Sequence, residues 1–301
     1  MRELGPLVDA LWLTEHLDDP TLVVADVRWY IDGRSGEAAY DAGHIPGAVF
    51  VDLDRDLAGP PSAGPGRHPL PSPERFAESM RRCGIGDDAT VVAYDDAGGS
   101  IAARLWWMLR ASGHTVTVLD GGISAWTGAL SIDVPSRRGS TQFTMSPWPI
   151  SMVVDVIAVD TYRRRADTVV IDARSPERYR GEPNAIDARA GHIPGAMNAP
   201  WIGNINPATG RFRSATELRA RFEALGIDGT RHAVCYCGSG VTACHNVLAL
   251  ELAGRSDTRL YPGSWSDWSA DPDRPVATGE LPGGEWNSVT AVRADGKPTP
   301  P

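Results

Sequence analysis

Short apolar runs alternate with longer amphipathic stretches along most of the chain. Two of these runs end in Asp-x-Arg, LVVADVR at 22–28 and TVVIDAR at 168–174. Two others end in tyrosine and precede loops, TVVAY at 90–94 and HAVCY at 232–236. Continuous apolar runs bounded by polar segments indicate buried strands. Their alternation with helical stretches predicts an α/β fold, in which helices cover both faces of parallel sheets.

The same order of motifs occurs twice along the chain. GHIPGA stands at residues 43–48 and again at 191–196. From Ser72 onward the second copy follows the first at a constant offset of 142 residues. Because the repeat unit has the size of a whole domain, the pattern indicates a duplicated domain and not a solenoid.

Serine and glycine residues predict the two ends of one helix in each copy. Ser72, which is followed by proline, and Ser214, which has Glu217 three residues later, are typical N-cap residues. Gly84 and Gly226 stand where each helix should end, because glycine readily takes the left-handed conformation of a C-terminal cap.

The repeat also predicts the domain boundaries. We expect domains at residues 1–128 and 149–282, joined by a linker rich in Ser, Pro and Arg at 129–148. Residues 283–301 are expected to form a loosely ordered tail. In the first copy the segment between GHIPGA and the helix cap is six residues longer, and the extra length falls in the Gly/Pro-rich stretch 58–66.

Composition narrows the classes of function. A net charge of −9 argues against nucleic acid as the main partner. No apolar run approaches the roughly 20 residues of a membrane span, and the N-terminus is unlike a secretory signal, so we expect a cytoplasmic protein. Lys297 is the only lysine, and arginine binds planar anions through a fork of donors. An arginine-lined pocket for a small anion fits this bias, although a compositional bias of the source genome explains it equally well.

The cysteine spacing favours one functional thiol. Cys235, Cys237 and Cys244 lie close together and Cys83 lies far away, which would be an unusual disulfide framework. A zinc site that includes His245 is an alternative, but the chain lacks a C-x2-C pair and a second ligand pair at the spacing of a zinc finger. We therefore expect no metal and a reducing compartment.

Cys237 closes a predicted strand and opens the loop Cys-Gly-Ser-Gly-Val-Thr, which leads into an apolar helix. Unpaired amides and the positive end of the helix dipole stabilise a thiolate at such a place. Gly238 and Gly240 allow successive N–H groups to form an anion-binding nest, which would hold a persulfide as readily as a thiolate. The alternative is a small buried cysteine beside a tight turn, and this is our interpretation of Cys235 and Cys244.

The two copies differ at the thiol position, where the first copy has Asp95. Only the second domain is therefore expected to perform thiol chemistry. Cysteine-dependent phosphatases use a similar architecture, but they carry an arginine six residues after the cysteine to clamp phosphate. That position is Ala243 here, so a phosphatase is a weak alternative.

The tandem copies, both GHIPGA segments and CGSGVTACHN at 237–246 resemble the rhodanese/3-mercaptopyruvate sulfurtransferase family over nearly the whole chain. The resemblance implies two tandem rhodanese-like domains, each a parallel five-stranded sheet flanked by helices. It also implies an inactive first domain, with Asp95 at the cysteine position, and a catalytic second domain. The implied reaction proceeds through a persulfide on Cys237 without a bound cofactor.

The loop sequence bears on the sulfur donor. Thiosulfate-preferring members of the family carry basic residues after the cysteine, as in C-R-K-G-V-T, whereas Gly238 and Ser239 are similar to the mercaptopyruvate type. The resemblance implies that Ser239 pairs with His68 and Asp54 of the first domain. Such a set can move a proton while a C–S bond breaks. The alternative for His68 is a solvent-exposed loop histidine.

Arginine residues are the candidates for binding the donor anion. Arg178 matches the substrate-carboxylate arginine of the family, and its alternative is a surface arginine on a charged helix. The second arginine of the mercaptopyruvate pattern is missing at Asn184, and Arg189 is a candidate replacement. The predicted substrate-binding residues are Arg178, Arg189, Gly238, Gly240, Val241 and Thr242.

These patterns predict a sulfurtransferase that moves a sulfane sulfur from 3-mercaptopyruvate or thiosulfate, through Cys237, to a thiol, cyanide or thioredoxin-like acceptor. One alternative is a thiosulfate sulfurtransferase (rhodanese) as the main activity. A second alternative, from another class, is a non-catalytic persulfide carrier or regulatory module. Neither nucleic acid nor a membrane is expected as a partner.

Overall fold

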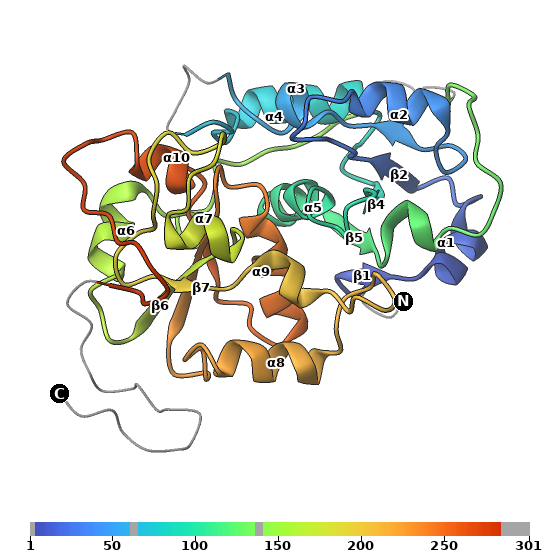
Figure 1. Ribbon diagram of the computed structural model, residues 1–301. Coiled ribbons are helices and arrows are strands. Elements are labelled where there is room, and N and C mark those ends of the chain that lie inside the picture. Colours follow the sequence, from blue (N-terminus) through green and yellow to red (C-terminus); the bar gives the residue numbers. More distant parts are fainter. Residues whose placement is uncertain (1–3, 61–65, 136–140, 284–301) are drawn as a thin grey trace.

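The first half of the chain forms a parallel sheet between two layers of helices (Figure 1). The computed structural model describes residues 4–60, 66–135 and 141–283. The first sheet has five strands in the order β1-β5-β4-β2-β3. The strands are β1 (Leu7–Val8), β2 (Leu22–Asp26), β3 (Val49–Phe50), β4 (Thr90–Tyr94) and β5 (Thr115–Leu119). The helices are α1 (Ala10–His16), α2 (Gly36–Ala42), α3 (Leu53–Asp56), α4 (Pro73–Arg82), α5 (Ala102–Ala111) and the 3-10 turn η2 (Gly122–Ala125).

The second half repeats this arrangement, which confirms the predicted α/β duplication. Its parallel sheet has the order β7-β6-β8-β9. The strands are β6 (Thr168–Asp172), β7 (Met197–Asn198), β8 (His232–Tyr236) and β9 (Arg259–Leu260). The helices are α6 (Val156–Tyr162), α7 (Pro176–Arg180), the 3-10 turn η3 (Trp201–Asn204), α8 (Ala215–Glu223), α9 (Ala243–Leu252) and α10 (Ser264–Trp268).

The second sheet corrects one expectation, because four strands are found in the described residues where five were predicted. The position that β1 holds in the first sheet is taken by Val153, which makes a single parallel bridge to Leu260. Just before it, the N–H groups of Met152 and Val153 both donate to the carbonyl of Pro149. The bridge thus lies between this turn and Asp155, which caps helix α6.

The duplicated motifs prove to be structural. Ser72 caps α4 and Ser214 forms a capping box with Glu217, as predicted.

In both domains the Asp-x-Arg motif is a buried ion pair of 2.6 Å, Arg28 with Asp26 and Arg174 with Asp172. Each of these arginines also donates to the carbonyl of the glycine that opens GHIPGA. The motif therefore ties the sheet to the following loop.

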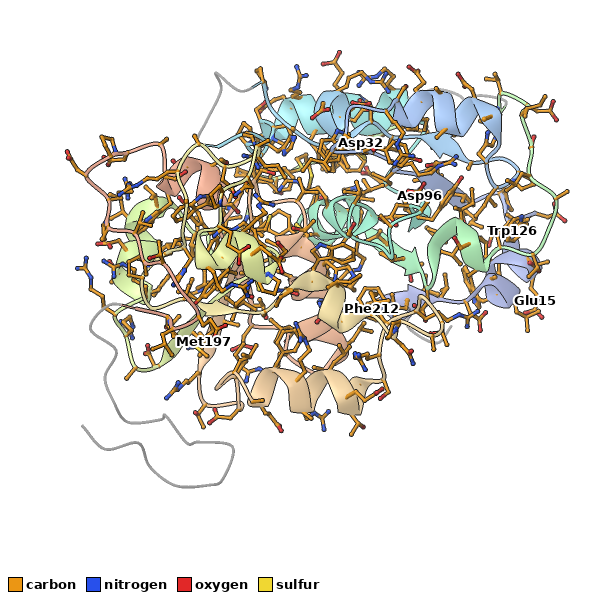
Figure 2. All side chains as sticks on the ribbon, viewed as in Figure 1. Glu15, Asp32, Asp96, Trp126, Met197 and Phe212 are labelled. Carbon is orange, nitrogen blue, oxygen red and sulfur yellow. The ribbon has the colours of Figure 1, made fainter. Side chains whose placement is uncertain are left out.

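The two domains share one apolar interface. Helices α5 and α9 pack against each other at the centre of the molecule (Figure 1), and one cluster of buried side chains runs through both domains. Trp106 and Trp107 of α5 and Leu248 of α9 belong to it. Phe212 reaches from the second domain to the first, where its N–H donates to Asp120 (Figure 2). This continuous core holds loops of one domain against those of the other.

Three of our expectations concern residues outside the described ranges. These are the tail after residue 283, residues 61–65 of the Gly/Pro-rich stretch and residues 136–140 of the linker. Within the described part of the chain, no helix is both long and apolar enough to cross a membrane.

Candidate active site

Cys237 follows β8 directly and lies in a loop that is held from behind by α10. Its N–H donates to the hydroxyl of Ser264 at 3.1 Å, and its carbonyl accepts from the N–H of Trp265 at 2.9 Å. The carbonyl of Gly238 accepts from the N–H of Ser266 at 3.0 Å. Ser264 has a positive φ of 55°, an unusual conformation for a side chain other than glycine. This bracing fixes the course of the loop before any ligand binds.

The sulfur of Cys237 faces backbone N–H groups. It accepts a hydrogen bond from the N–H of Gly240 at 3.2 Å. Among the described residues, the amides of Ser239, Val241 and Ala243 have no hydrogen-bond acceptor. Gly240 has φ +82°, and a side chain there would lie 2.4 Å from the carbonyl oxygen of Pro262, so only glycine fits. The loop therefore has several free N–H donors, an arrangement typical of an anion-binding nest.

Asp95, the counterpart of Cys237 in the first domain, shows what such a nest holds. Its fully buried carboxylate accepts from the N–H groups of Ala97, Gly99, Ile101 and Ala102, at 2.8–2.9 Å. A carboxylate oxygen lies as many bonds from Cα as the outer sulfur of a cysteine persulfide. The first domain thus carries a carboxyl group at the position where the second could carry a persulfide. Burial raises the pKa of this carboxyl group, and the hydrogen bonds from the four N–H groups work against that rise.

Three residues from the two domains form a hydrogen-bonded chain beside the thiol. His68 Nδ1 lies 2.7 Å from the hydroxyl of Ser239, and His68 Nε2 lies 3.1 Å from a carboxylate oxygen of Asp54. The indole of Trp29 donates to the other oxygen of Asp54 at 2.9 Å. The hydrogen bond from His68 lowers the pKa of Asp54, and the bond from Trp29 adds to this against the effect of burial. An ionised Asp54 keeps the proton on Nε2, so Nδ1 accepts from Ser239.

Asp187 forms ion pairs with several arginines near the loop of Cys237. Arg178 donates to both of its carboxylate oxygens, at 2.8 and 2.6 Å, and Arg174 lies 3.3 Å away. Arg67, from the first domain, lies 3.9 Å from the same carboxylate and donates to the carbonyl of Ile186. Burial opposes the charge on Asp187, but the hydrogen bonds and positive charges of the arginines outweigh it and lower its pKa.

Gly238 lies directly under two guanidinium groups. A side chain there would lie 2.7 Å from Nη2 of Arg178 and 2.9 Å from Nη2 of Arg67. Arg189, the predicted replacement for the missing second arginine, points elsewhere: it donates to the carbonyls of Asp271 and Arg274. The structure therefore places Arg67, and not Arg189, next to Arg178.

The remaining thiols and His245 belong to the core. Burial raises the pKa of Cys244 to about 12 and also raises the pKa of Cys235 well above its usual value. His245 is fully buried, and its two ring nitrogens bond to Asn204 and to the carbonyl of Gly98. Since both nitrogens are engaged, His245 is not available as a zinc ligand.

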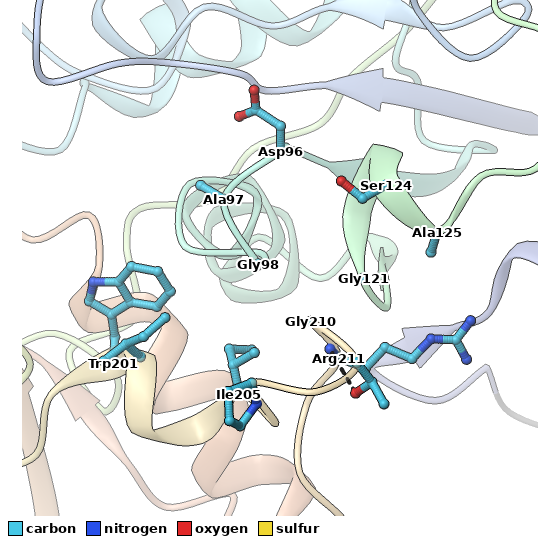
Figure 3. Close-up of a pocket in the computed structure, with 13 residues that line it drawn as sticks. Asp96, Ala97, Gly98, Gly121, Ser124, Ala125, Trp201, Ile205, Gly210 and Arg211 are labelled. Carbon is cyan, nitrogen blue, oxygen red and sulfur yellow. Dashed lines mark hydrogen bonds between the residues drawn. The ribbon is translucent and has the colours of Figure 1, made fainter.

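A cavity of about 620 Å³ lies between the domains, beside the loop that carries Asp95 (Figure 3). Asp96, Ala97 and Gly98 line one side, and Trp201 and Ile205 line the other. It is the first-domain counterpart of the region around Cys237. Its lining has an acidic residue, Asp96, at the position equivalent to Gly238.

Sequence reasoning missed Arg67, Asp187 and Arg104. Arg67 precedes His68 in the chain, which is a signal that it lies in the same loop. Arg104 is the one charged residue within the apolar stretch 101–109, a pattern that indicates a buried charge with a specific partner. Asp187 carries no local signal, because its role comes only from the arginines that the fold gathers around it.

Comparisons with known proteins agree with this geometry. The rhodanese-like domain family matches residues 9–129 and 158–271. A probable 3-mercaptopyruvate sulfurtransferase of Pseudomonas aeruginosa is 43% identical over 91% of this chain and 98% of its own. A putative thiosulfate sulfurtransferase of Mycobacterium tuberculosis, SseB, is also 43% identical, over 87% and 92%. The crystal structure of the 3-mercaptopyruvate sulfotransferase SseA from Escherichia coli has a TM-score of 0.77 at 34% identity, over 87% of this chain and 100% of that one.

Fold and site together define a duplicated α/β protein. The loop of the second domain holds a cysteine among backbone N–H groups, and the equivalent loop of the first domain holds the carboxyl group of Asp95 instead. The chain belongs to the family of tandem rhodanese-domain 3-mercaptopyruvate and thiosulfate sulfurtransferases. It is a sulfurtransferase, so it takes sulfur from a donor and passes it to an acceptor.

Proposed function

We propose that 3-mercaptopyruvate is the main sulfur donor and that Cys237 carries the sulfur as a persulfide. The observation that carries this proposal is the chain from Ser239 through His68 to Asp54. Release of pyruvate from mercaptopyruvate requires a proton at the carbon that loses sulfur, whereas release of sulfite from thiosulfate does not. A hydroxyl–imidazole–carboxylate chain next to the thiol supplies such a proton path.

In the proposed reaction, the thiolate of Cys237 attacks the thiol sulfur of the donor. An S–S bond forms, the C–S bond breaks, and its electron pair stays on the three-carbon fragment as the enolate of pyruvate. The thiol proton of the donor reaches this enolate through Ser239 and His68. The products are pyruvate and the anion Cys237–S–S⁻, from which an acceptor thiolate then takes the outer sulfur.

The free amides of the loop support the persulfide. The N–H groups of Ser239, Val241 and Ala243 correspond to those that bind the Asp95 carboxylate in the first domain. We assign Gly238, Gly240, Val241 and Thr242 to this nest. Hydrogen bonds to a charged acceptor are roughly twice as strong as neutral ones, so the nest favours the anionic persulfide.

Arg178 and Arg67 would hold the carboxylate of the donor above Gly238. The same pair of cations favours the second candidate, thiosulfate, which is a dianion. In the C-R-K-G-V-T loop the cation comes from the residue after the cysteine. Here Arg67 would supply it from the other domain, so thiosulfate is expected as a slower donor.

Intact mass spectrometry tests the central proposal. After incubation with 3-mercaptopyruvate or thiosulfate and removal of the donor, the wild-type chain should gain one sulfur atom. Cys237→Ser should gain none, while Cys83→Ser should gain sulfur as the wild type does. Absence of a gain with both donors contradicts the persulfide and favours a non-catalytic module.

Replacement of His68 should affect the reactions with the two donors differently. His68→Ala is expected to slow pyruvate release from mercaptopyruvate about a hundred-fold or more, because general acid–base catalysis is lost. Sulfite release from thiosulfate should change only a few-fold. His114→Ala, which affects a histidine far from Cys237, is the matched control. Equal losses with both donors would show that His68 has a structural role only.

Further assignments follow from the duplication. We propose domains at 1–128 and 149–282 with a linker at 129–148. We also propose a reducing, cytoplasmic location, which the four free cysteines favour. A thiol, cyanide or a thioredoxin-like protein is the proposed acceptor, since each can attack the outer sulfur of a persulfide.

A further inference from the structure

Arg104 of α5 is a buried cation that crosses the domain interface. Its side chain has no exposed surface. It donates to the carbonyl of Gly240 at 3.1 Å and to that of His68 at 3.2 Å, and also to the carbonyl of Leu57. It therefore joins the nest loop of the second domain to the histidine that the first domain supplies.

Within the described ranges, no carboxylate balances the charge of Arg104. Burial works against the charge and lowers the pKa of Arg104, and the only titratable groups in the described ranges that oppose this effect are the thiols of Cys244 and Cys237. The other guanidinium groups at the site share Asp187 or Asp172. A buried charge without a partner is costly, so an anion nearby should relieve that cost.

A corresponding contact runs from a helix of the second domain to the loop of the first domain, and it is uncharged. His245 of α9 bonds to the carbonyl of Gly98, which corresponds to Gly240 in the first domain. Burial lowers the pKa of His245 to about 4, so this contact carries no charge near neutral pH. The loop with the buried Asp95 carboxyl group thus receives an uncharged donor, and the loop with the thiol receives a cation.

We propose that Arg104, supplied by the domain without a thiol, is a positioning residue that provides the buried counter-charge for the sulfur anion on Cys237. This inference rests on the proposed persulfide chemistry and adds an electrostatic role for the first domain. Arg104 does not touch the donor. It acts through the Gly240 carbonyl and through its field on the sulfur, stabilising both thiolate and persulfide.

Other charged or titratable groups also face the thiol from the surrounding elements. They are His68, Asp54 and Arg67 of the first domain, and Arg178, Asp187 and Cys244 of the second. A test of Arg104 must therefore change its charge while leaving these groups in place.

The rate at which iodoacetamide alkylates Cys237, followed by intact mass from about pH 5 to about pH 9, provides that test. Arg104→Gln keeps hydrogen-bonding capacity but removes the charge, and it should move the midpoint of the alkylation profile up by about one pH unit or more. Arg104→Lys retains the charge and should stay close to wild type. Persulfide formation at neutral pH should slow about ten-fold in Arg104→Gln and recover largely in Arg104→Lys.

Arg110→Gln is the matched control, because Arg110 lies on the same helix and pairs with Glu251 across the interface at 2.7 Å. It should leave the profile unchanged. Equal losses of activity in Arg104→Gln and Arg104→Lys, with an unshifted profile, would overturn the proposal and leave only a structural role. Wild-type persulfide formation is measured separately, so failure of the proposed function would be recognised in its own right.

A second measurement keeps Arg104 itself unchanged. Cys237→Asp, which copies Asp95 of the first domain, is compared with Cys237→Asn by thermal unfolding at neutral pH. The aspartate variant should unfold at a higher temperature, because its charge faces Arg104. An equal or lower unfolding temperature contradicts the counter-charge.

Discussion

Arg67 and Arg178 hold two positive charges over Gly238, and Asp187 is the shared carboxylate between them. The pKa of Arg67 is lowered, mainly by burial and further by the like charge of Arg178. Two cations held this closely repel each other, so a second anion besides Asp187 would stabilise them. This is the physical reason to assign the donor carboxylate to this place.

Arg67→Ala should therefore weaken donor binding. We expect an increase of about ten-fold in KM for 3-mercaptopyruvate with little change in kcat, since the carboxylate is held equally in ground and transition states. Steady-state kinetics measure both constants. Arg75→Ala, which alters an exposed arginine on α4, should change neither. A fall in kcat at constant KM would contradict the role of Arg67 in binding.

At the scale of the element, the two glycines of the nest loop have different tasks. At Gly240 an added methyl group would meet the backbone of Pro262, and the positive φ is strained for alanine. At Gly238 it would meet the ends of two flexible arginine side chains, which can move.

Gly240→Ala should thus lower the free energy of unfolding by about 1–3 kcal/mol and abolish sulfur transfer, because the nest cannot form. Gly238→Ala should unfold like the wild type in urea but show a raised KM for the donor. Urea unfolding and kinetics on both variants check this pair. Equal destabilisation of the two variants would mean that the loop tolerates no change at either glycine.

The sequence predicted the elements better than the contacts between them. Local patterns identified the buried strands, the caps at Ser72 and Ser214 and the thiol between strand and helix. The prediction of a fifth strand in the second sheet was wrong, because the chain makes only a single bridge at Val153 before helix α6 begins. The expectation for Arg189 failed because the fold turns that side chain towards Asp271, while Arg67 reaches Gly238 from another domain. Such long-range positions leave no periodic signal in the chain.

At the scale of the whole molecule, the interface should be sensitive to pH. Burial lowers the pKa of His245 to about 4, against about 6.5 for an unfolded histidine. Between these values the unfolded chain binds a proton that the folded chain does not. The contribution of His245 to the free energy of unfolding is therefore fully present above about pH 6.5 and is lost as the pH falls towards 4. The loss amounts to at most about 3 kcal/mol.

His245→Gln should reduce this dependence, since glutamine can bond to Gly98 without titrating. The free energy of unfolding in urea, measured at about pH 7 and about pH 5, should fall less in the variant than in the wild type. His232→Gln, at an exposed histidine on β8, is the control. The same pH dependence in wild type and His245→Gln would show that His245 is not the responsible group.

Both domains contain a loop of this kind, but different groups surround the two loops in the described residues. The first nest lacks more than a thiol. Next to Asp95 stands Asp96, whose carboxylate accepts from Tyr30, in place of Gly238 under two guanidinium groups. Apolar residues of the second domain, Trp201 and Ile205, line the cavity beside Asp96, whereas His68 and Arg67 lie at the loop of Cys237.

A thiol placed in the first nest should therefore stay inactive. In the double variant Asp95→Cys/Cys237→Ser, the introduced thiol would lack the Ser239–His68–Asp54 chain and the pair Arg67 and Arg178, which lie at the loop of Cys237. Intact mass after incubation with either donor should show no gain of sulfur, as in Cys237→Ser alone, and thermal unfolding should verify that the variant is folded. A gain at a rate near that of the wild type would mean that an amide nest alone is sufficient. The arginines and the histidine of the first domain that lie near Cys237 would then not be needed for sulfur transfer. The proposal that each domain has its own role in the reaction would be wrong.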